Sequence, residues 1–388
     1  MIKVTLFSQI ISLLPKAKIR SVIQELGSDY GCKGYDTWSQ LVSMMFCQFG
    51  HCDSVRDLSN GLRSATGNLN HLGIVRGPSK STVAYANKHR KWKVFERIFY
   101  TLLDEIGPKF PRYRIPKVHL KRKIFSMDST LISLCIDAFD WAHYRRAKGA
   151  IKLHTVLDYD GLLPVFIDMT DGKTHDVQIA KTLEFPSGSV LLIDRAYLSF
   201  DWLSVLDSSG VFFVTRMKKN IKYEVSQTYD IQGSPSQILS DDDILLLGQH
   251  SAKKYPGTLR LVTVEDPDSG KQIQFLTNNL TWKAQTISEL YRQRWQIEIF
   301  FKQIKQNLKI KSFIGTSANA VLIQVWTAMI TILLLKYLRE VAKYNWNLSN
   351  LISFIRLNLF VKIDLTTWLD KPYNPRGSPK STQLQLFS

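Results

Sequence analysis

The chain has 388 residues, enough for two or three domains and a sizeable core. Hydrophobic residues make up 45% of the chain and charged residues 22%, which is ordinary for a soluble globular protein. The 51 lysines and arginines outnumber the 33 acidic residues, so the net charge is +18. This excess favours a polyanionic partner, nucleic acid first of all, and a generally basic protein is the alternative.

Two features argue against a secreted or membrane-bound protein. The start of the chain carries no secretory signal with a small-residue cleavage site. The most apolar stretch, 321–335, is short for a membrane span and contains Gln324 and Thr327, so it is predicted to be a core helix. We therefore expect a cytoplasmic protein that associates with the nucleoid when it acts and has no membrane partner.

The cysteines are Cys32, Cys47, Cys52 and Cys135, and none forms a C-x-x-C pair. Cys47, His51 and Cys52 are close enough in sequence to suggest a metal site, but a fourth ligand is not evident. Buried free thiols in a reducing cytosol are the favoured interpretation.

Residues 1–120 are predicted to form a helical N-terminal domain that binds DNA. An apolar stripe at helical spacing covers 37–49, a second helix follows a cap at Asp53 or Ser54, and a third starts at Ser79 or Ser81. Two short helices before a basic end fit a helix-turn-helix, with an ordinary helical pair as the alternative. The basic end, 88–123, has twelve lysines and arginines against three acids, interleaved with aromatic residues.

From 121 the periodicity changes to that of strands. Residues 121–137 are predicted to form a strand, a tight turn and a second strand, and 150–172 a hairpin around Asp160-Gly161. A short helix is expected in 175–183. The apolar run that ends at Asp194 is typical of a buried central strand, and 210–220 reads as another strand. These elements indicate an α/β fold, a mixed sheet with helices packed on it.

The remaining chain divides by pattern into three parts. Residues 218–284 alternate with turn residues and hold no convincing helix, so we predict a β-rich insertion there. Long helices return at about 286. The catalytic part of the chain is accordingly predicted to comprise 121–217 and 285–340, and 341–388 a C-terminal helical segment with a loose tail.

The segment 291–310 is predicted to be one amphipathic helix. At about 100° per residue, its core-facing stripe lies between about 220° and 280°. Within an arc of about 60° beside that stripe fall Tyr291, Arg294, Glu298 and Lys305. A carboxylate between two cations and a phenol at this border would sit at the edge of a cleft. The alternative is an intrahelical salt bridge, because Arg294 and Glu298 are four residues apart.

Two aspartates strengthen the interpretation of a site. Asp128 and Asp194 each end an apolar run, on strands that can be neighbours in one sheet. A single aspartate there is more often a turn former or a cap. Two of them with Glu298 make a carboxylate trio, which suits Mg²⁺ with phosphate oxygens and water in its shell. Arg294, Lys305 and Tyr291 would then hold phosphates of the same strand.

The signature Y-x2-R-x3-E-x6-K is present as Tyr291, Arg294, Glu298 and Lys305, with "SMDST" and "IDRAY" around the two aspartates. With these motifs, residues 120–335 resemble the DDE transposases of insertion sequence family four. The first 110 residues also look like the helical domain that often precedes this core.

The resemblance implies a ribonuclease-H-like fold with a β-rich insertion and Mg²⁺-dependent cut-and-paste transposition, with Mn²⁺ as a possible ion. It implies that Asp128, Asp194 and Glu298 are catalytic metal ligands. It implies that Tyr291, Arg294 and Lys305 contact the DNA of the transposon end. Some family members hold a flipped base with an aromatic residue of the insertion, a role left open for Trp282.

Three functions follow as candidates. The first is a transposase that cleaves at terminal inverted repeats and joins the 3′-OH to target DNA, as a homodimer on double-stranded DNA. The second is a metal-dependent nuclease without strand transfer, and the third a DNA-binding protein without catalysis. Lesser candidates are His154 and His175 at the cleft and Trp295 on DNA, with packing as the alternative for each.

Overall fold

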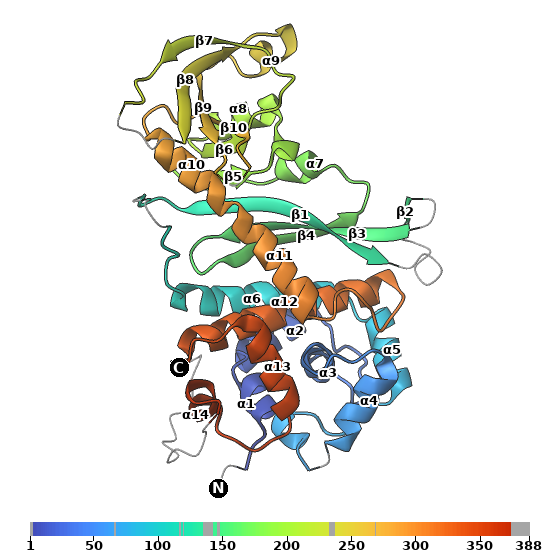
Figure 1. Ribbon diagram of the computed structural model, residues 1–388. Coiled ribbons are helices and arrows are strands. Elements are labelled where there is room, and N and C mark those ends of the chain that lie inside the picture. Colours follow the sequence, from blue (N-terminus) through green and yellow to red (C-terminus); the bar gives the residue numbers. More distant parts are fainter. Residues whose placement is uncertain are drawn as a thin grey trace. The chain divides into compact units, whose positions relative to one another are not determined.

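The computed structural model describes residues 3–65, 67–115, 118, 120–134, 143–145, 148–232, 237–267 and 269–373 (Figure 1). The loose tail predicted after 373 and Cys135 lie outside the described residues. The chain forms two compact units. We call them the helical unit, which is Met1–Phe110, Ile132–Ala150 and Phe301–Ser388, and the α/β unit, which is Pro111–Leu131 and Ile151–Phe300. The domain boundaries inferred from the sequence stay predictions.

The helical unit combines helices from both ends of the chain. Those of the N-terminal part are α1 (Leu6–Ser12), α2 (Lys16–Glu25), α3 (Thr37–Gly50), α4 (Val55–Ser64), η1 (Asn70–Leu72), α5 (Lys80–His89), α6 (Lys93–Ile106) and η2 (Gly107–Lys109). Those of the C-terminal part are α12 (Ala318–Val341), α13 (Leu348–Asn358) and α14 (Leu365–Asp370). The N-terminal region is therefore helical, as predicted.

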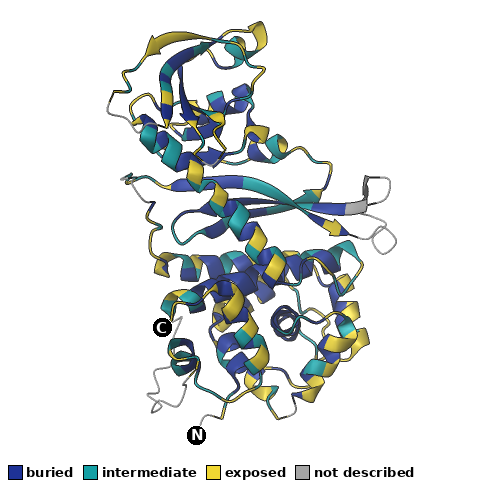
Figure 2. Ribbon diagram, viewed as in Figure 1, coloured by how far each residue is buried: buried dark blue, intermediate teal, exposed yellow. Residues whose placement is uncertain are grey.

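The predicted caps start these helices. Ser54 begins α4 and Ser79 begins α5, each accepting a hydrogen bond from a backbone amide three residues on. Residues 51–54 connect α3 to α4, whereas α4 and α5 are separated by 65–79, far more than the turn of a helix-turn-helix. Every residue of α3 from Thr37 to Phe49 is buried, so α3 has no free face for a ligand (Figure 2).

The core of the helical unit is built on α12, which packs against α3, α5 and α6. It is long and apolar enough to cross a membrane by composition, but most of its residues are buried inside the protein. Gln324 on α12 donates its side-chain amide to the carbonyls of Lys309 and Ser312, at 2.6 and 2.8 Å. The prediction of a core helix over 321–335 is confirmed.

The α/β unit is built on a mixed sheet. The strands of this sheet are β1 (Ile124–Leu134), β2 (His143–Arg145), β3 (Lys148–Asp158), β4 (Leu163–Asp171), β5 (Val190–Ile193), β6 (Phe212–Arg216), β7 (Tyr223–Thr228), β8 (Ile238–Leu246), β9 (Leu259–Glu265) and β10 (Gln272–Thr277). β2 and the adjoining ends of β1 and β3 fall within the segment Ile132–Ala150 of the helical unit. The strand order is β2-β3-β1-β5-β6-β10-β9-β8-β7, with β4 paired to β3. β1, β5 and β6 run parallel, and the pairs from β6 to β7 are antiparallel.

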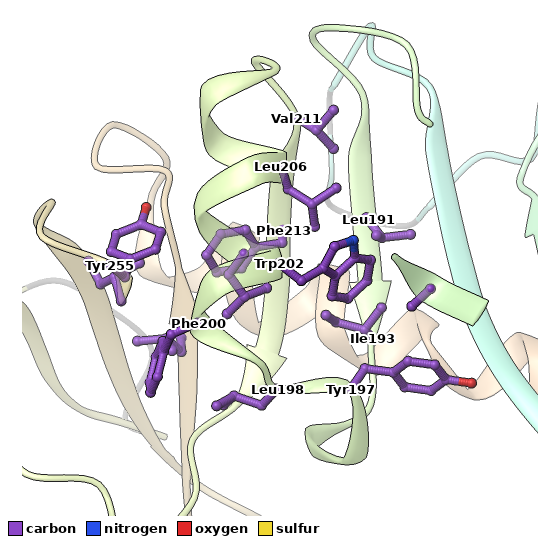
Figure 3. Packing of buried hydrophobic residues seen from close by; sticks show 14 of the residues in the cluster. Leu191, Ile193, Tyr197, Leu198, Phe200, Trp202, Leu206, Val211, Phe213 and Tyr255 are labelled. Atoms are coloured by element: carbon purple, nitrogen blue, oxygen red, sulfur yellow. The ribbon is translucent and has the colours of Figure 1, made fainter. Parts of the chain in front are cut away.

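Helices cover both faces of this sheet. They are α7 (Asp176–Ala180), η3 (Arg195–Tyr197), α8 (Phe200–Ser208), α9 (Gln249–Lys254), α10 (Ala284–Gln293) and the start of α11 (Trp295–Asn307), which continues into the helical unit. Figure 3 shows Trp202 and Leu206 of α8 beside Leu191 and Ile193 of β5. The alternate residues Val190 and Leu192 face the other core, with α10. The large mixed sheet confirms the predicted fold class, with its ribonuclease-H-like arrangement.

Some local predictions were correct and others were wrong. The hairpin around Asp160-Gly161 is confirmed as antiparallel β3 and β4. The tight turn predicted within 121–137 is absent from the described part of that stretch, because β1 is one strand from Ile124 to Leu134 and pairs with β3 and β5. The stretch 218–284 does contain a helix, α9, and its strands extend the main sheet through the pairing of β10 with β6.

The predicted single helix over 291–310 is interrupted. α10 ends at Gln293, α11 begins at Trp295, and Arg294 lies at the junction with helical dihedral angles. The amides of Arg294 and Ile297 bond to carbonyls three residues earlier, at 3.0 and 3.3 Å, so the turn is tighter than an α-helix. Tyr291 and Glu298 therefore belong to different helices.

Candidate active site

The register of two parallel strands brings Asp128 and Asp194 together. Met127 of β1 pairs with Ile193 of β5, so the residues that follow them, Asp128 and Asp194, are also side by side. Neighbouring strands are about 4.8 Å apart. Met127 and Ile193 both belong to the core under α8, and by alternation both aspartates face the opposite side, where α10 packs.

Arg294 connects Asp128 to Glu298. Its Nη2 donates to Oε1 of Glu298 at 2.6 Å, and its Nη1 lies 3.5 Å from Oδ2 of Asp128. The Arg294 side chain is only 12% exposed, and those of Asp128 and Glu298 are 21% and 31% exposed. The intrahelical salt bridge weighed as an alternative is thus present, and it is extended to the sheet.

Backbone amides fix the two aspartates. The amide of Ser129 donates to Oδ1 of Asp128 at 2.8 Å, and that of Ala196 donates to Asp194 at 3.0 Å, capping η3. The pKa of Asp128 is raised to about 6. Burial is the main cause; the Ser129 amide and Arg294 oppose it, and the carboxylates of Asp194 and Glu298 add to it. The carboxylates of Asp194 and Glu298 therefore both act electrostatically on Asp128.

The donor set suits a divalent metal ion, because it consists of three carboxylates and hard divalent ions prefer oxygen ligands. Within the described ranges, however, no group of three or more His, Cys, Asp or Glu side chains is arranged to hold an ion. Arg294 lies between two of the acids instead. The residue types fit a metal, and this arrangement of their side chains does not.

Tyr291 is only 7% exposed. Its ring centre lies 4.8 Å from that of Phe275, and the guanidinium groups of Arg216 and Arg294 each lie 5.7 Å from it. Lys305 lies in the helical unit, where burial and Lys311 lower its pKa. Contacts of Tyr291, Arg294 and Lys305 with DNA stay predictions.

The structure also places His154, one of the lesser candidates, and adds Lys152 and Thr170 around it. His154, fully buried, lies with Nδ1 3.5 Å from Asp176 and Nε2 2.9 Å from the hydroxyl of Thr170. Lys152 lies 3.4 Å from Asp176. Burial lowers the pKa of His154. These contacts give His154 a packing and hydrogen-bonding environment, the alternative weighed for it, and they depend on residues of β4 and α7 that no local pattern brings together.

Other candidate residues are also placed. Trp295 is 58% exposed, so it is not a packing residue. Trp282 packs its ring 5.2 Å from Phe212. Cys47 and Cys52 are buried free thiols, and His51 bonds to the carbonyl of Asn307 at 2.8 Å. These cysteines and His51 are not part of a metal-binding group of three in the described chain.

The helical unit contains a long stretch of chain without acidic residues. Between Asp57 and Glu96 the sequence has no acidic residue and seven lysines and arginines. Arg90 is buried and holds Gln40 and Tyr35, and the exposed ones are Arg63, Arg76, Lys80, Lys88, Lys91 and Lys93. Tyr85 on α5 is 67% exposed and stacks on His89, 4.1 Å between ring centres. We call the exposed side chains of α5 and these six cations the basic α5 surface.

Comparison with known families gives two matches. Residues 119–334 match the family described as "Transposase DDE domain", and residues 3–75 match a domain of unknown function, DUF4372. The first match covers more than half of the chain and contains all six of the residues singled out by the signature and the two aspartates.

Individual relatives agree with this match. A chain named as a transposase, y4zB, in Sinorhizobium fredii is 31% identical over 78% of this chain and 85% of its own length. A chain named as the transposase for insertion sequence element IS5377 in Geobacillus stearothermophilus is 30% identical, over 71% and 72% of the two chains. Among solved structures, a piggyBac transposase synaptic complex with hairpin DNA has a TM-score of 0.42 and 11% identity, over 97% of this chain and 82% of that one.

Proposed function

Because the chain belongs to the DDE transposase family, we propose that Asp128, Asp194 and Glu298 are its catalytic residues and that Mg²⁺, or alternatively Mn²⁺, is their ion. The family acts on DNA as polynucleotidyl transferases and depends on divalent metal. The single observation that carries the assignment is the register of β1 and β5, which sets Asp128 beside Asp194 on the face where α10 packs.

The residues of the chain have separate tasks in this proposal. The strands hold the two aspartates rigidly, and Glu298 comes from a helix packed at the same face. These three carboxylates would hold the ion, which would supply Lewis-acid stabilisation for the attacking and leaving oxygens of an in-line displacement at phosphorus. Arg294 and Tyr291 lie beside the acids, and Trp295 is exposed next to them, a position from which it could stack on DNA.

The substrate we propose is the terminal inverted repeats of an insertion sequence, of family four, with target DNA as the second substrate. The reaction is hydrolysis that frees a 3′-OH at each end, followed by attack of that hydroxyl on target DNA. Two ends must react together, which favours a homodimer on DNA.

The test is an assay of the intact protein with a duplex that carries one end of its own element, plasmid target DNA and Mg²⁺. Cleavage followed by joined product is the expected result. A nuclease without strand transfer would cleave and give no joined product, and a catalytically silent binding protein would leave the duplex intact.

Recognition of the ends is proposed for the helical unit, through the basic α5 surface. Its six exposed cations are complementary to a polyanion, and the stretch 58–95 that supplies them contains no acidic residue. A pocket of about 630 Å³ adjoins α5 and is lined by Tyr30, Lys33 and Tyr85, among others. Exposed aromatic rings among cations are typical of surfaces that bind nucleic acid.

We expect the double variant Lys80→Ala/Lys88→Ala to lower the slope of log affinity against log salt by about two for the end duplex, since each lysine neutralises about one phosphate. The measurement is a salt titration of binding by fluorescence anisotropy. The control is Lys362→Ala, an exposed lysine beyond α13. Equal slopes for the double variant, the control and the parent protein would remove the α5 surface from the interface.

A further inference from the structure

The carboxylates proposed to hold the metal already share a cation, Arg294. Its guanidinium reaches both Glu298, at 2.6 Å, and Asp128, at 3.5 Å. The arginine side chain is 12% exposed, so water screens these two interactions poorly. The Arg294 guanidinium therefore competes with any cation for the carboxylate oxygens of Asp128 and Glu298.

The oxygen atoms involved make the competition specific. Oδ1 of Asp128 accepts the amide of Ser129, and Oδ2 is the atom nearest to Arg294. Oε1 of Glu298 accepts Nη2 of the same arginine. Arg294 therefore already occupies one oxygen of each carboxylate, and its positive charge would oppose a cation held by Asp128 and Glu298.

Arg294 lies at a point of the backbone where a change of conformation is easier than inside a helix. It is the junction residue between α10 and α11, where the helical hydrogen bonds shorten to a spacing of three residues. Such junctions change conformation more readily than helix interiors. Arg294 also lies over the ring of Tyr291, which offers its guanidinium a second surface.

We propose that Arg294 is a positioning residue that holds Asp128 and Glu298 in place of the metal, and that a DNA phosphate releases it. Phosphate is the anion that an arginine fork binds in two-point fashion, so DNA can draw the guanidinium from the carboxylates. A free dication would otherwise meet a fixed positive charge. Metal and DNA then bind with positive coupling, and the coupling is reciprocal. This proposal rests on the proposed function only in taking Asp128 and Glu298 as metal ligands.

The test measures Mn²⁺ binding to the full-length protein, by the electron paramagnetic resonance signal of free Mn²⁺. Without DNA, Arg294→Gln is expected to bind Mn²⁺ at least about tenfold more tightly than the parent, because a nearby positive charge is removed. Adding end duplex should tighten Mn²⁺ binding by the parent and change that of Arg294→Gln little. The matched control is Arg292→Gln, two residues away, with a side chain 58% exposed and paired only weakly to Glu289 at 3.9 Å.

Two further variants keep the result decisive. Arg294→Lys keeps the charge and should keep Mn²⁺ affinity near that of the parent, so it tests the charge even where Arg294→Gln folds poorly. Asp128→Asn should abolish Mn²⁺ binding; if it does not, the proposed metal site fails and the role of Arg294 fails with it, whereas a failure confined to Arg294→Gln overturns the role of Arg294 alone. Mn²⁺ binding by Arg294→Gln that is equal to or weaker than that of Arg292→Gln would overturn the proposal.

Discussion

Asp128→Asn, Asp194→Asn and Glu298→Gln are each expected to lower single-turnover strand cleavage by at least about a hundredfold, because each removes one charged oxygen ligand from the ion. Binding to the end duplex should change little, since these acids contribute no attraction to phosphate. The β1–β5 register sets the two aspartates side by side, and Arg294 contacts both Asp128 and Glu298. The measurement is cleavage at saturating DNA and Mg²⁺, with affinity measured separately.

The control for charge removal is Asp171→Asn, at the end of β4, where the carboxylate accepts the amide and hydroxyl of Thr174 in an exposed turn. It should cleave at the parent rate. Any one of the three active-site variants that cleaves at nearly normal rate would take that residue out of the site, and melting curves separate this from unfolding.

Arg260→Met is expected to lower the free energy of unfolding of the α/β unit by about 3–5 kcal/mol, because it leaves a buried carboxylate without its partner. Arg260 on β9 donates to both oxygens of Asp241 on β8, at 2.7 and 2.6 Å. The two side chains are 6% and 7% exposed. Arg260 also donates to the carbonyl of Leu280 at 3.0 Å. The measurement is urea unfolding.

The double variant Arg260→Met/Asp241→Leu should recover part of the lost stability, because the Asp241 carboxylate is then no longer buried without its partner, although Asp243 opposite Arg260 stays buried. The control is Lys181→Met, which removes an ion pair with Asp201 whose side chains are 44% and 40% exposed. That change should cost no more than about 1 kcal/mol. Should Arg260→Met unfold at the same urea concentration as the parent, the pair contributes nothing to the sheet.

Local patterns were sufficient where an element depends on nearby residues. The hairpin around Asp160-Gly161 and the caps Ser54 and Ser79 were predicted correctly, because turn geometry and capping bonds involve residues three or fewer apart. Alternating and continuous apolar runs likewise predicted the mixed sheet and its central strand β5. The fold class followed from these.

Local patterns failed where distant partners decided the outcome. Residues 121–137 contain turn-forming Asp128 and Ser129, yet pairing with neighbouring strands keeps β1 extended through them. The helical wheel of 291–310 assumed one straight helix, whereas the helix is interrupted at Arg294, between α10 and α11. The apolar periodicity is the same on both sides of such a break, so the sequence pattern does not reveal where the helix is interrupted.

The sequence by itself determined the residue types of the proposed site and the spacing of Arg294 and Glu298, since four residues make one helical turn. Only the tertiary structure decided that Asp128 joins this pair. Asp128 lies beside Asp194 because of the register of β1 and β5, although the two aspartates are more than sixty residues apart in sequence. Asp128 lies near Arg294 because α10 covers the face of the sheet to which Asp128 points. Register and face are set by the packing of two apolar cores, which involve residues from the whole unit and have no local pattern.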